Sequence, residues 1–114
     1  MNLETAEDFQ VANYGIGGHY IPHVDYAGDS KAFKNKGNRI ATFMMYLSDV
    51  ELGGYTVFTE IGVKVKPLKG SAVFWFNLKK NGDGDRRTRH AACPVIIGNK
   101  WGNLFFRVIL KFRV

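Results

Sequence analysis

The chain has 114 residues, enough for one small domain with a single core and too few for a second lobe. Hydrophobic residues make up 46% and charged residues 23%, which excludes a disordered chain, and no apolar run approaches the roughly 20 residues of a membrane-spanning helix. Lys and Arg number 16 against 10 Asp and Glu, a net charge of +6, but the cations are scattered, so the charge does not predict a nucleic-acid surface.

Short strands are expected throughout the first half of the chain. Residues 9–14 predict a strand that ends at the glycine-rich residues 15–18. Residues 19–26 predict a second, with Tyr20, Pro22, Val24 and Tyr26 on one face and His19, Ile21, His23 and Asp25 on the other. Residues 28–38 predict a polar loop containing one helical turn. Residues 39–47 are almost continuously apolar, which predicts a strand buried on both faces.

The second half continues in the same way. Strands are expected at residues 55–58, 63–66, 71–76, 90–97 and 104–112, with turns at 53–54, 67–70 and 81–84. We expect the aromatic residues 74–76 to lie in the core. About eight short strands without long helices predict a mainly β fold, either a sandwich, a jelly roll or a small barrel.

Two features bear on the cellular compartment. The N-terminus has neither the basic nor the apolar region of a secretory signal, so we expect either a cytosolic protein or a chain that starts inside a longer one. The single cysteine, Cys93, excludes an internal disulfide and any multi-cysteine zinc site.

Two histidines and an aspartate form the candidate metal site. His23 and Asp25 project from the same face of their expected strand, and His90 begins another strand 67 residues later. Two imidazoles and one carboxylate on one side of a metal leave the opposite positions open, which is the arrangement of non-haem Fe(II) oxygenases. The alternative is that His23 is an ordinary strand residue hydrogen-bonded to its neighbour.

Further polar residues could serve the same pocket. Lys100 could pair with the far carboxylate of a dianionic co-substrate, or it could be a surface lysine in a turn. Tyr14 could donate a hydrogen bond there or simply pack. Arg86, Arg87 and Arg89 either attract an anionic co-substrate or form a solvated face.

The residues also carry a family resemblance. Residues 10–25 (QVANYGIGGHYIPHVD), 37–42, 46–50, 53–58, 70–78, 88–95 (TRHAACPV) and 98–101 (GNKW) resemble the catalytic domain of collagen prolyl 4-hydroxylase α subunits, in the order in which that family has them. The resemblance runs from about residue 3 to residue 101.

This resemblance implies an Fe(II)- and 2-oxoglutarate-dependent dioxygenase on a double-stranded β-helix of the jelly-roll or cupin-like type. It implies that the iron ligands are His23, Asp25 and His90. It further implies that Lys100 binds the C5 carboxylate of 2-oxoglutarate and that Tyr14 and Tyr46 line the co-substrate pocket.

The implied reaction is the hydroxylation of peptidyl proline at C4 by O2 and 2-oxoglutarate, giving succinate and CO2. L-Ascorbate would rescue iron that becomes oxidised. The resemblance also implies collagen-like X-Pro-Gly substrates, assembly with protein disulfide isomerase as the β subunit, and a place in the endoplasmic reticulum lumen.

The chain departs from the family at its ends. We expect a partial dioxygenase domain over residues 1–101 and a divergent C-terminal segment over residues 102–114, so that the fold is truncated at both ends relative to the family. Cys93 matches a family cysteine whose partner would lie in the tail that this segment replaces. Two functions therefore stay open: an active hydroxylase, or a catalytically inactive truncated or splice-variant fragment that only binds metal or a partner subunit.

Overall fold

The computed structural model describes residues 7–8, 10–27 and 38–109, and this part of the chain is almost entirely β-structure. The strands are β1 (Gln10–Tyr14), β2 (Tyr20–His23), β3 (Asn38–Tyr46), β4 (Leu52–Gly53), β5 (Thr56–Phe58), β6 (Val63–Val65), β7 (Ala72–Phe76), β8 (His90–Ala92), β9 (Val95–Ile97) and β10 (Lys100–Ile109). The 3-10 turn η2 (Arg86–Thr88) precedes β8. None of the described residues belongs to a helix long and apolar enough to cross a membrane.

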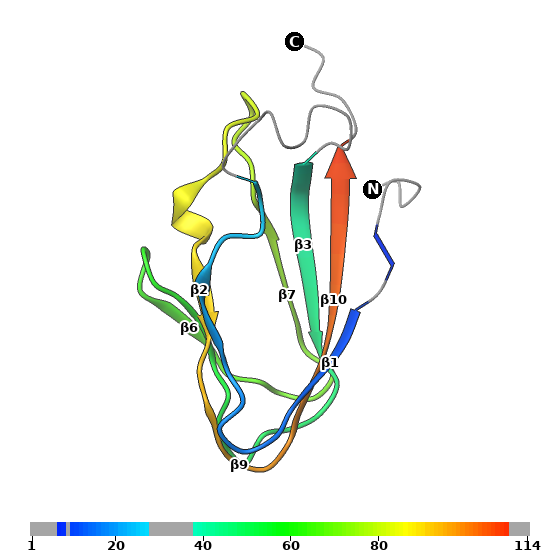
Figure 1. The fold of residues 1–114 in the computed structure, drawn as a ribbon, viewed down its shortest axis with the longest axis vertical. Helices are drawn as coiled ribbons and strands as arrows, with labels where there is room; N and C mark the ends of the chain where they lie inside the picture. The colour runs from blue at the N-terminus through cyan, green and yellow to red at the C-terminus, as the bar shows by residue number, and fades with distance from the viewer. Residues whose placement is uncertain (1–6, 9, 28–37, 110–114) are drawn as a thin grey trace.

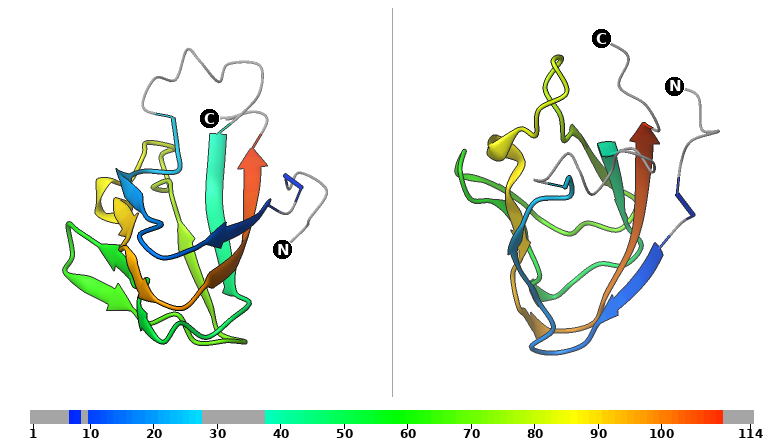
Figure 2. Two further views of the ribbon diagram at one scale, coloured as in Figure 1. Left: turned by 60° about the horizontal axis from the view of Figure 1, so that its bottom comes forward. Right: turned by 45° about the horizontal axis from the view of Figure 1, so that its top comes forward.

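Two four-stranded antiparallel sheets face each other. Sheet A has the strand order β1-β10-β3-β7 and sheet B has the order β2-β8-β5-β6, while β4 and β9 form a separate two-stranded ladder. Figure 1 shows the sheets on opposite sides of the molecule, and the two further views of Figure 2 show the same arrangement from other directions. The prediction of a mainly β, double-stranded β-helix is confirmed.

Strand β3 occupies the centre of sheet A, between β10 and β7. Ala41, Thr42 and Tyr46 are 2%, 0% and 1% exposed. A central strand covered on both faces needs apolar side chains on both, which explains the nearly continuous apolar run of its sequence. The predicted burial of this strand is therefore confirmed, although Leu47, beyond its end, is exposed.

Strand β7 corrects the prediction for the aromatic segment. Trp75 is buried and points into the molecule, but Phe74 and Phe76 are 44% and 55% exposed. Successive side chains of a strand point to opposite faces, so with Trp75 directed inward Phe74 and Phe76 lie on the outer face of sheet A, where the described residues leave them partly uncovered. The expectation that all three aromatic residues lie in the core is wrong.

Strand β2 is shorter than expected, and its alternation is interrupted. Its pairing with β8 shifts register between Tyr20 and His23. The ring of Tyr20 therefore lies against the ring of His23, with centroids 4.0 Å apart, although strict alternation places these two residues on opposite faces. The predicted alternation of this segment is wrong for Tyr20.

The end of the chain is also divided differently from the prediction. Residues 90–97 form two strands in different ladders, because Pro94 has no N–H to continue the β8 pairing. Strand β10 begins at Lys100 rather than at residue 104. The expected loop covers residues 28–38, but Asn38 already belongs to β3. Residues 28–37 and the expected strand end at 110–112 lie outside the described residues, and the domain division at residue 101 stays a prediction.

Gly53 supplies a stability test of the β4–β9 ladder. It has a φ of +82°, and a Cβ there would lie 2.5 Å from the carbonyl oxygen of Pro94. We expect Gly53→Ala to lower the free energy of unfolding by about 2–4 kcal/mol, the range of a severe steric substitution. Gly62 is the matched control: its φ is +68° but no atom lies within 4 Å, so Gly62→Ala should cost only the left-handed backbone strain of about 1–2 kcal/mol. Equal losses in urea unfolding would contradict this account.

Candidate metal centre and co-substrate pocket

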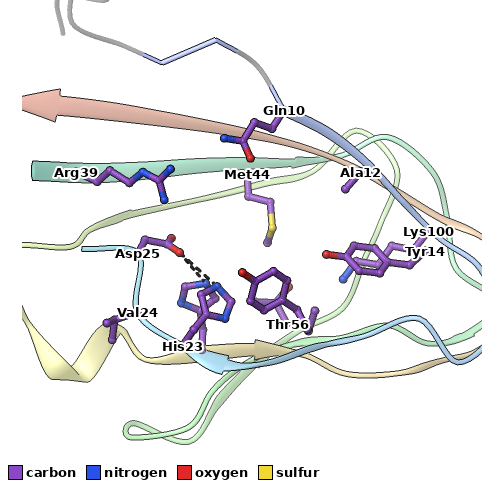
Figure 3. A pocket seen from close by; sticks show the side chains of 14 residues that line it. Gln10, Ala12, Tyr14, His23, Val24, Asp25, Arg39, Met44, Thr56 and Lys100 are labelled. Atoms are coloured by element: carbon purple, nitrogen blue, oxygen red, sulfur yellow. Dashed lines mark ion pairs between the residues drawn. The ribbon is translucent and has the colours of Figure 1, made fainter. Parts of the chain in front are cut away.

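A pocket of about 340 Å³ lies between the two sheets (Figure 3). Sheet A, sheet B and the residues that follow β2 all contribute side chains to it. Its lining consists of Gln10, Ala12, Tyr14, Tyr20, His23, Val24, Asp25, Arg39, Met44, Thr56, His90, Ala92, Lys100 and Gly102. Five of the six predicted site residues are in this lining, and the sixth, Tyr46, lies behind it.

Strand register brings the two histidines together. His23 and His90 are direct partners in the antiparallel pairing of β2 and β8, and their ring centroids are 4.4 Å apart. Asp25 follows two residues after His23, and its Oδ1 lies 3.4 Å from Nε2 of His23 and 3.6 Å from Nε2 of His90. One ligand atom from each residue therefore falls within 4.8 Å of the others, a spacing that could hold a metal ion.

Backbone carbonyls fix the orientation of both imidazoles. Nδ1 of His23 lies 2.8 Å from the carbonyl oxygen of Ile21, and Nδ1 of His90 lies 2.8 Å from that of Thr88. A carbonyl oxygen can only accept, so each Nδ1 carries the proton and donates it. In the neutral ring Nε2 then keeps its lone pair, and in both residues that lone pair is directed at the centre of the cluster.

Asp25 is held in an analogous way. Its side chain is 6% exposed, and its Oδ2 accepts a hydrogen bond of 2.8 Å from the Thr42 hydroxyl, which leaves Oδ1 for the centre. Burial alone would raise the pKa of this carboxyl group, but the hydrogen bonds from His23 and Thr42 and the neighbouring imidazoles together lower it. The carboxylate is thus anionic at neutral pH.

The pKa values of the two imidazoles are shifted in opposite directions. Burial lowers the pKa of His90 and so favours its neutral form. Burial is also the largest single influence on His23, but the Asp25 carboxylate and the hydrogen bond to the Ile21 carbonyl together outweigh it, so the pKa of His23 is raised. A divalent cation binds neutral imidazole and ionised carboxylate, so metal binding would favour the unprotonated Nε2 in both residues. The three side chains therefore fit a metal such as Fe(II) in both geometry and chemistry.

Lys100 occupies another part of the pocket, beside Tyr14 in Figure 3. The residue is only 4% exposed, and its ammonium lies 5.5 Å from the ring centroid of Tyr14 and 5.9 Å from that of Tyr46. Burial lowers its pKa, and no carboxylate of the described residues forms an ion pair with it. The alternative that Lys100 is an ordinary surface lysine is wrong. A buried cation without an anion is suited to an anionic ligand.

Tyr46 and Thr56 form a polar pair beside Lys100. The sequence predicts Tyr46 as a pocket residue but not Thr56. The hydroxyl of Tyr46 and Oγ1 of Thr56 are 2.7 Å apart, and the two residues are 1% and 2% exposed. Burial raises the pKa of Tyr46, so its hydroxyl stays protonated. Thr56 lines the pocket and was missed by the sequence analysis, since an isolated threonine on a short strand has no distinguishing signal.

The arginines before β8 do not line the pocket. Arg87 forms an ion pair of 2.6 Å with Asp85, which also caps η2 by accepting from the backbone N–H of Arg87. The expectation that this cluster draws in an anionic co-substrate has no support in the structure. The ion pair of Arg87 with Asp85 stabilises η2. This turn ends at Thr88, whose carbonyl oxygen accepts the hydrogen bond from Nδ1 of His90.

Asp85 gives this turn a pH dependence. The hydrogen bond from Arg87 lowers the pKa of Asp85 to about 2, below its ordinary value of 3.8. The stabilisation is therefore complete above pH 3.8 and is lost as the pH falls toward 2. Asp85→Asn keeps an oxygen that can cap η2 but removes the charge that faces Arg87, so we expect it to lower the stability at neutral pH and the difference from wild type to shrink as the pH falls toward 2. Urea unfolding across this range checks it, and a difference that is undiminished at pH 2 would contradict it.

Comparison with known proteins agrees with this geometry. Residues 9–107 match the family model of the 2OG-Fe(II) oxygenase superfamily. The chain belongs to this superfamily. As a 2OG-Fe(II) oxygenase it is expected to use Fe(II) and 2-oxoglutarate, the two groups that the metal-binding cluster and the Lys100 region of the pocket can accommodate.

Its relatives are prolyl 4-hydroxylases. The oxygenase is 58% identical over 105 residues to human prolyl 4-hydroxylase subunit alpha-1 and 55% identical over 103 residues to chicken subunit alpha-2. These matches cover 89% of this chain, and the chain spans about a fifth of the length of the curated relatives. The resemblance seen in the sequence is confirmed.

Solved structures give the same result for the fold. The viral collagen prolyl hydroxylase of Paramecium bursaria Chlorella virus-1, in its 2OG complex, superposes with a TM-score of 0.83 at 34% identity, covering 91% of this chain and 60% of that one. A prolyl-4-hydroxylase of Pseudomonas putida superposes with a TM-score of 0.61 at 22% identity. The match covers 91% of this chain and 54% of the Pseudomonas chain, and it supports the fold alone.

Proposed function

We propose that this chain is the core of a prolyl 4-hydroxylase that binds Fe(II) through His23, Asp25 and His90. The observation that carries the proposal is the convergence of three pre-oriented ligand atoms within 4.8 Å, in a pocket that also holds the buried Lys100. Bound Fe(II) would couple the reduction of O2 to the oxidative decarboxylation of 2-oxoglutarate and the oxidation of a C–H bond.

The residues of the pocket bind and orient the co-substrate. The ammonium of Lys100 pairs with the C5 carboxylate of 2-oxoglutarate, which supplies the anion that the buried lysine lacks among the described residues. The hydroxyls of Tyr14, Tyr46 and Thr56 offer polar contacts at the same end. The keto acid end then faces the metal-binding cluster, and the sheets on both sides limit the access of water.

The proposed substrate is a peptidyl proline. Support comes from the 58% identity to a prolyl 4-hydroxylase subunit over nearly the whole chain. The reaction hydroxylates proline at C4 in collagen-like X-Pro-Gly segments and releases succinate and CO2, with L-ascorbate restoring oxidised iron. The proposal extends to assembly with protein disulfide isomerase and to the lumen of the endoplasmic reticulum, where such α subunits act.

An anaerobic titration tests the site before turnover. Purified protein is mixed with Fe(II) and then with 2-oxoglutarate, and the weak visible charge-transfer band of the chelate is recorded. We expect a saturable band. Admission of O2 with a Pro-Pro-Gly repeat peptide should then give 4-hydroxyproline and an equal amount of succinate, both measured by mass spectrometry.

The outcomes separate the two functions that the sequence left open. A band together with hydroxyproline establishes the enzyme. A band without peptide oxidation supports a fragment that only binds metal and co-substrate, and it overturns the proposed hydroxylase activity of this chain. Folded protein without any band overturns the proposed metal centre itself.

A further inference from the structure

A series of buried hydrogen bonds runs from Trp75 to the carboxylate of Asp25. The indole Nε1 of Trp75 donates to Oδ1 of Asn77 at 2.7 Å, and Nδ2 of Asn77 donates to Oγ1 of Thr42 at 2.8 Å. The hydroxyl of Thr42 then donates to Oδ2 of Asp25 at 2.8 Å. Trp75 is 9% exposed, while Asn77 and Thr42 are fully buried at 0%.

The chemistry of the groups allows only one direction of donation. An indole N–H can only donate, so it fixes which end of the Asn77 amide is the oxygen. The amide nitrogen must then point at Thr42 and donate to its oxygen. The Thr42 proton is left for the one remaining acceptor, the carboxylate of Asp25. This direction favours an ionised Asp25 whose Oδ2 is occupied and whose Oδ1 is free.

The strand pairing explains how these side chains meet. Thr42 and Trp75 are direct partners in the pairing of β3 and β7, and Asn77 follows Trp75 by two residues, on the same face. The same residues also contact the other side of the metal-binding cluster. The ring of Trp75 packs edge-on against His90 with centroids 4.9 Å apart, and the carbonyl oxygen of Asn77 accepts from the backbone N–H of Asp85, which caps η2.

We propose that Trp75, Asn77 and Thr42 form a positioning relay that holds the Asp25 carboxylate in its metal-binding orientation before the metal arrives. The inference rests on the proposed metal centre and assigns these residues a role in it. None of the three residues touches the metal position, so they are positioning residues. Outer partners of metal ligands commonly change affinity about 10- to 100-fold when they are removed.

Co(II) binding in the absence of 2-oxoglutarate tests the relay without turnover. The variant Thr42→Val keeps the shape of the side chain and removes the hydroxyl, whereas Thr42→Ser keeps the hydroxyl. We expect Thr42→Val to raise the Kd for Co(II) about 10- to 100-fold and to change its visible d–d bands. Thr42→Ser should restore both the affinity and the bands. Measurement well below the melting temperature of each variant separates these effects from a loss of stability.

The variant Trp75→Phe provides an independent test, since it keeps an aromatic ring at this position while it removes the indole donor together with part of the ring volume. We expect weaker Co(II) binding, and we expect the double variant Thr42→Val with Trp75→Phe to bind no more weakly than Thr42→Val alone, because both act through one series of bonds. If Thr42→Val does not fold, Trp75→Phe carries the same test.

Three results would overturn the relay. One is a Thr42→Val protein, or in its place a Trp75→Phe protein, with the wild-type Kd and bands. Another is a double variant whose losses add as those of independent sites do. The third is wild-type protein that does not bind Co(II), which would overturn the proposed metal centre and the relay with it.

Discussion

His23→Ala should abolish Fe(II) binding, while His19→Ala should leave it unchanged. Loss of an outer partner of a ligand can lower metal affinity by roughly 100-fold, and loss of one of the three ligands themselves should lower it by more. Proline hydroxylation should therefore fall to background. Equilibrium dialysis of Fe(II) under anaerobic conditions measures the first effect, and succinate release measures the second.

His19 is a close match for this comparison. It lies in the same stretch of chain, and its Nδ1 also lies near the carbonyl oxygen of the residue two positions earlier, at 2.9 Å from Gly17. Its imidazole is outside the cluster that could hold a metal. Equal loss in both variants would mean that the local loop structure, and not ligation by His23, determines Fe(II) binding.

The second large effect is expected at Lys100. Truncating one partner of a buried charge pair typically costs 2–5 kcal/mol, so Lys100→Met should raise the KM for 2-oxoglutarate by about 30-fold to several thousand-fold. Fe(II) affinity should remain close to that of the wild type, because Lys100 is not part of the metal-binding cluster. The exposed Lys64 on β6 is the control, and Lys64→Met should leave both quantities unchanged.

The same substitution should stabilise the protein without its co-substrate. The ammonium of Lys100 is buried with no ion pair to a described carboxylate, so its desolvation is offset only in part, by the rings of Tyr14 and Tyr46. Because its pKa is lowered in the fold, the unfolded chain holds the proton more tightly, and wild-type stability should rise as the pH approaches 10.5. Lys100→Met should show a higher Tm and lack this rise. A lower Tm would contradict this expectation, since it would mean that the contacts with Tyr14 and Tyr46 outweigh the desolvation of Lys100.

The sequence was sufficient for the parts of the fold that follow simple periodicity. The continuous apolar run of β3 predicts a central strand, and the glycine turns mark where most strands end. The grouping of His23, Asp25 and His90 is also predicted from the sequence, which places His23 and Asp25 on one face of an expected strand and His90 at the start of another. In the structure Asp25 lies in the bend that follows β2, and the grouping is kept. The buried position of Lys100 is consistent with that resemblance, whereas spacing alone left a surface turn open.

Other features depend on contacts between strands that are distant in the sequence, so the local residue pattern cannot predict them. The register shift in β2 turns Tyr20 toward His23, and only the pairing with β8 reveals it. The exposure of Phe74 and Phe76 depends on which face of β7 is turned toward sheet B, and Trp75 occupies that face. Thr42 and Asn77 appear in the sequence as ordinary polar residues of an apolar strand or its end, and their shared hydrogen bond exists because β3 and β7 are neighbours.

The direct pairing of His23 with His90 has a consequence for folding. The two histidines belong to strands far apart in the chain, so their contact closes a long loop and costs loop-closure entropy. No short peptide cut from this chain contains the centre. Metal affinity therefore reports whether β2 and β8 have paired. Both strands belong to sheet B, so a metal ion bound by His23 and His90 would join neighbouring strands of one sheet and would have to dissociate before those strands could separate.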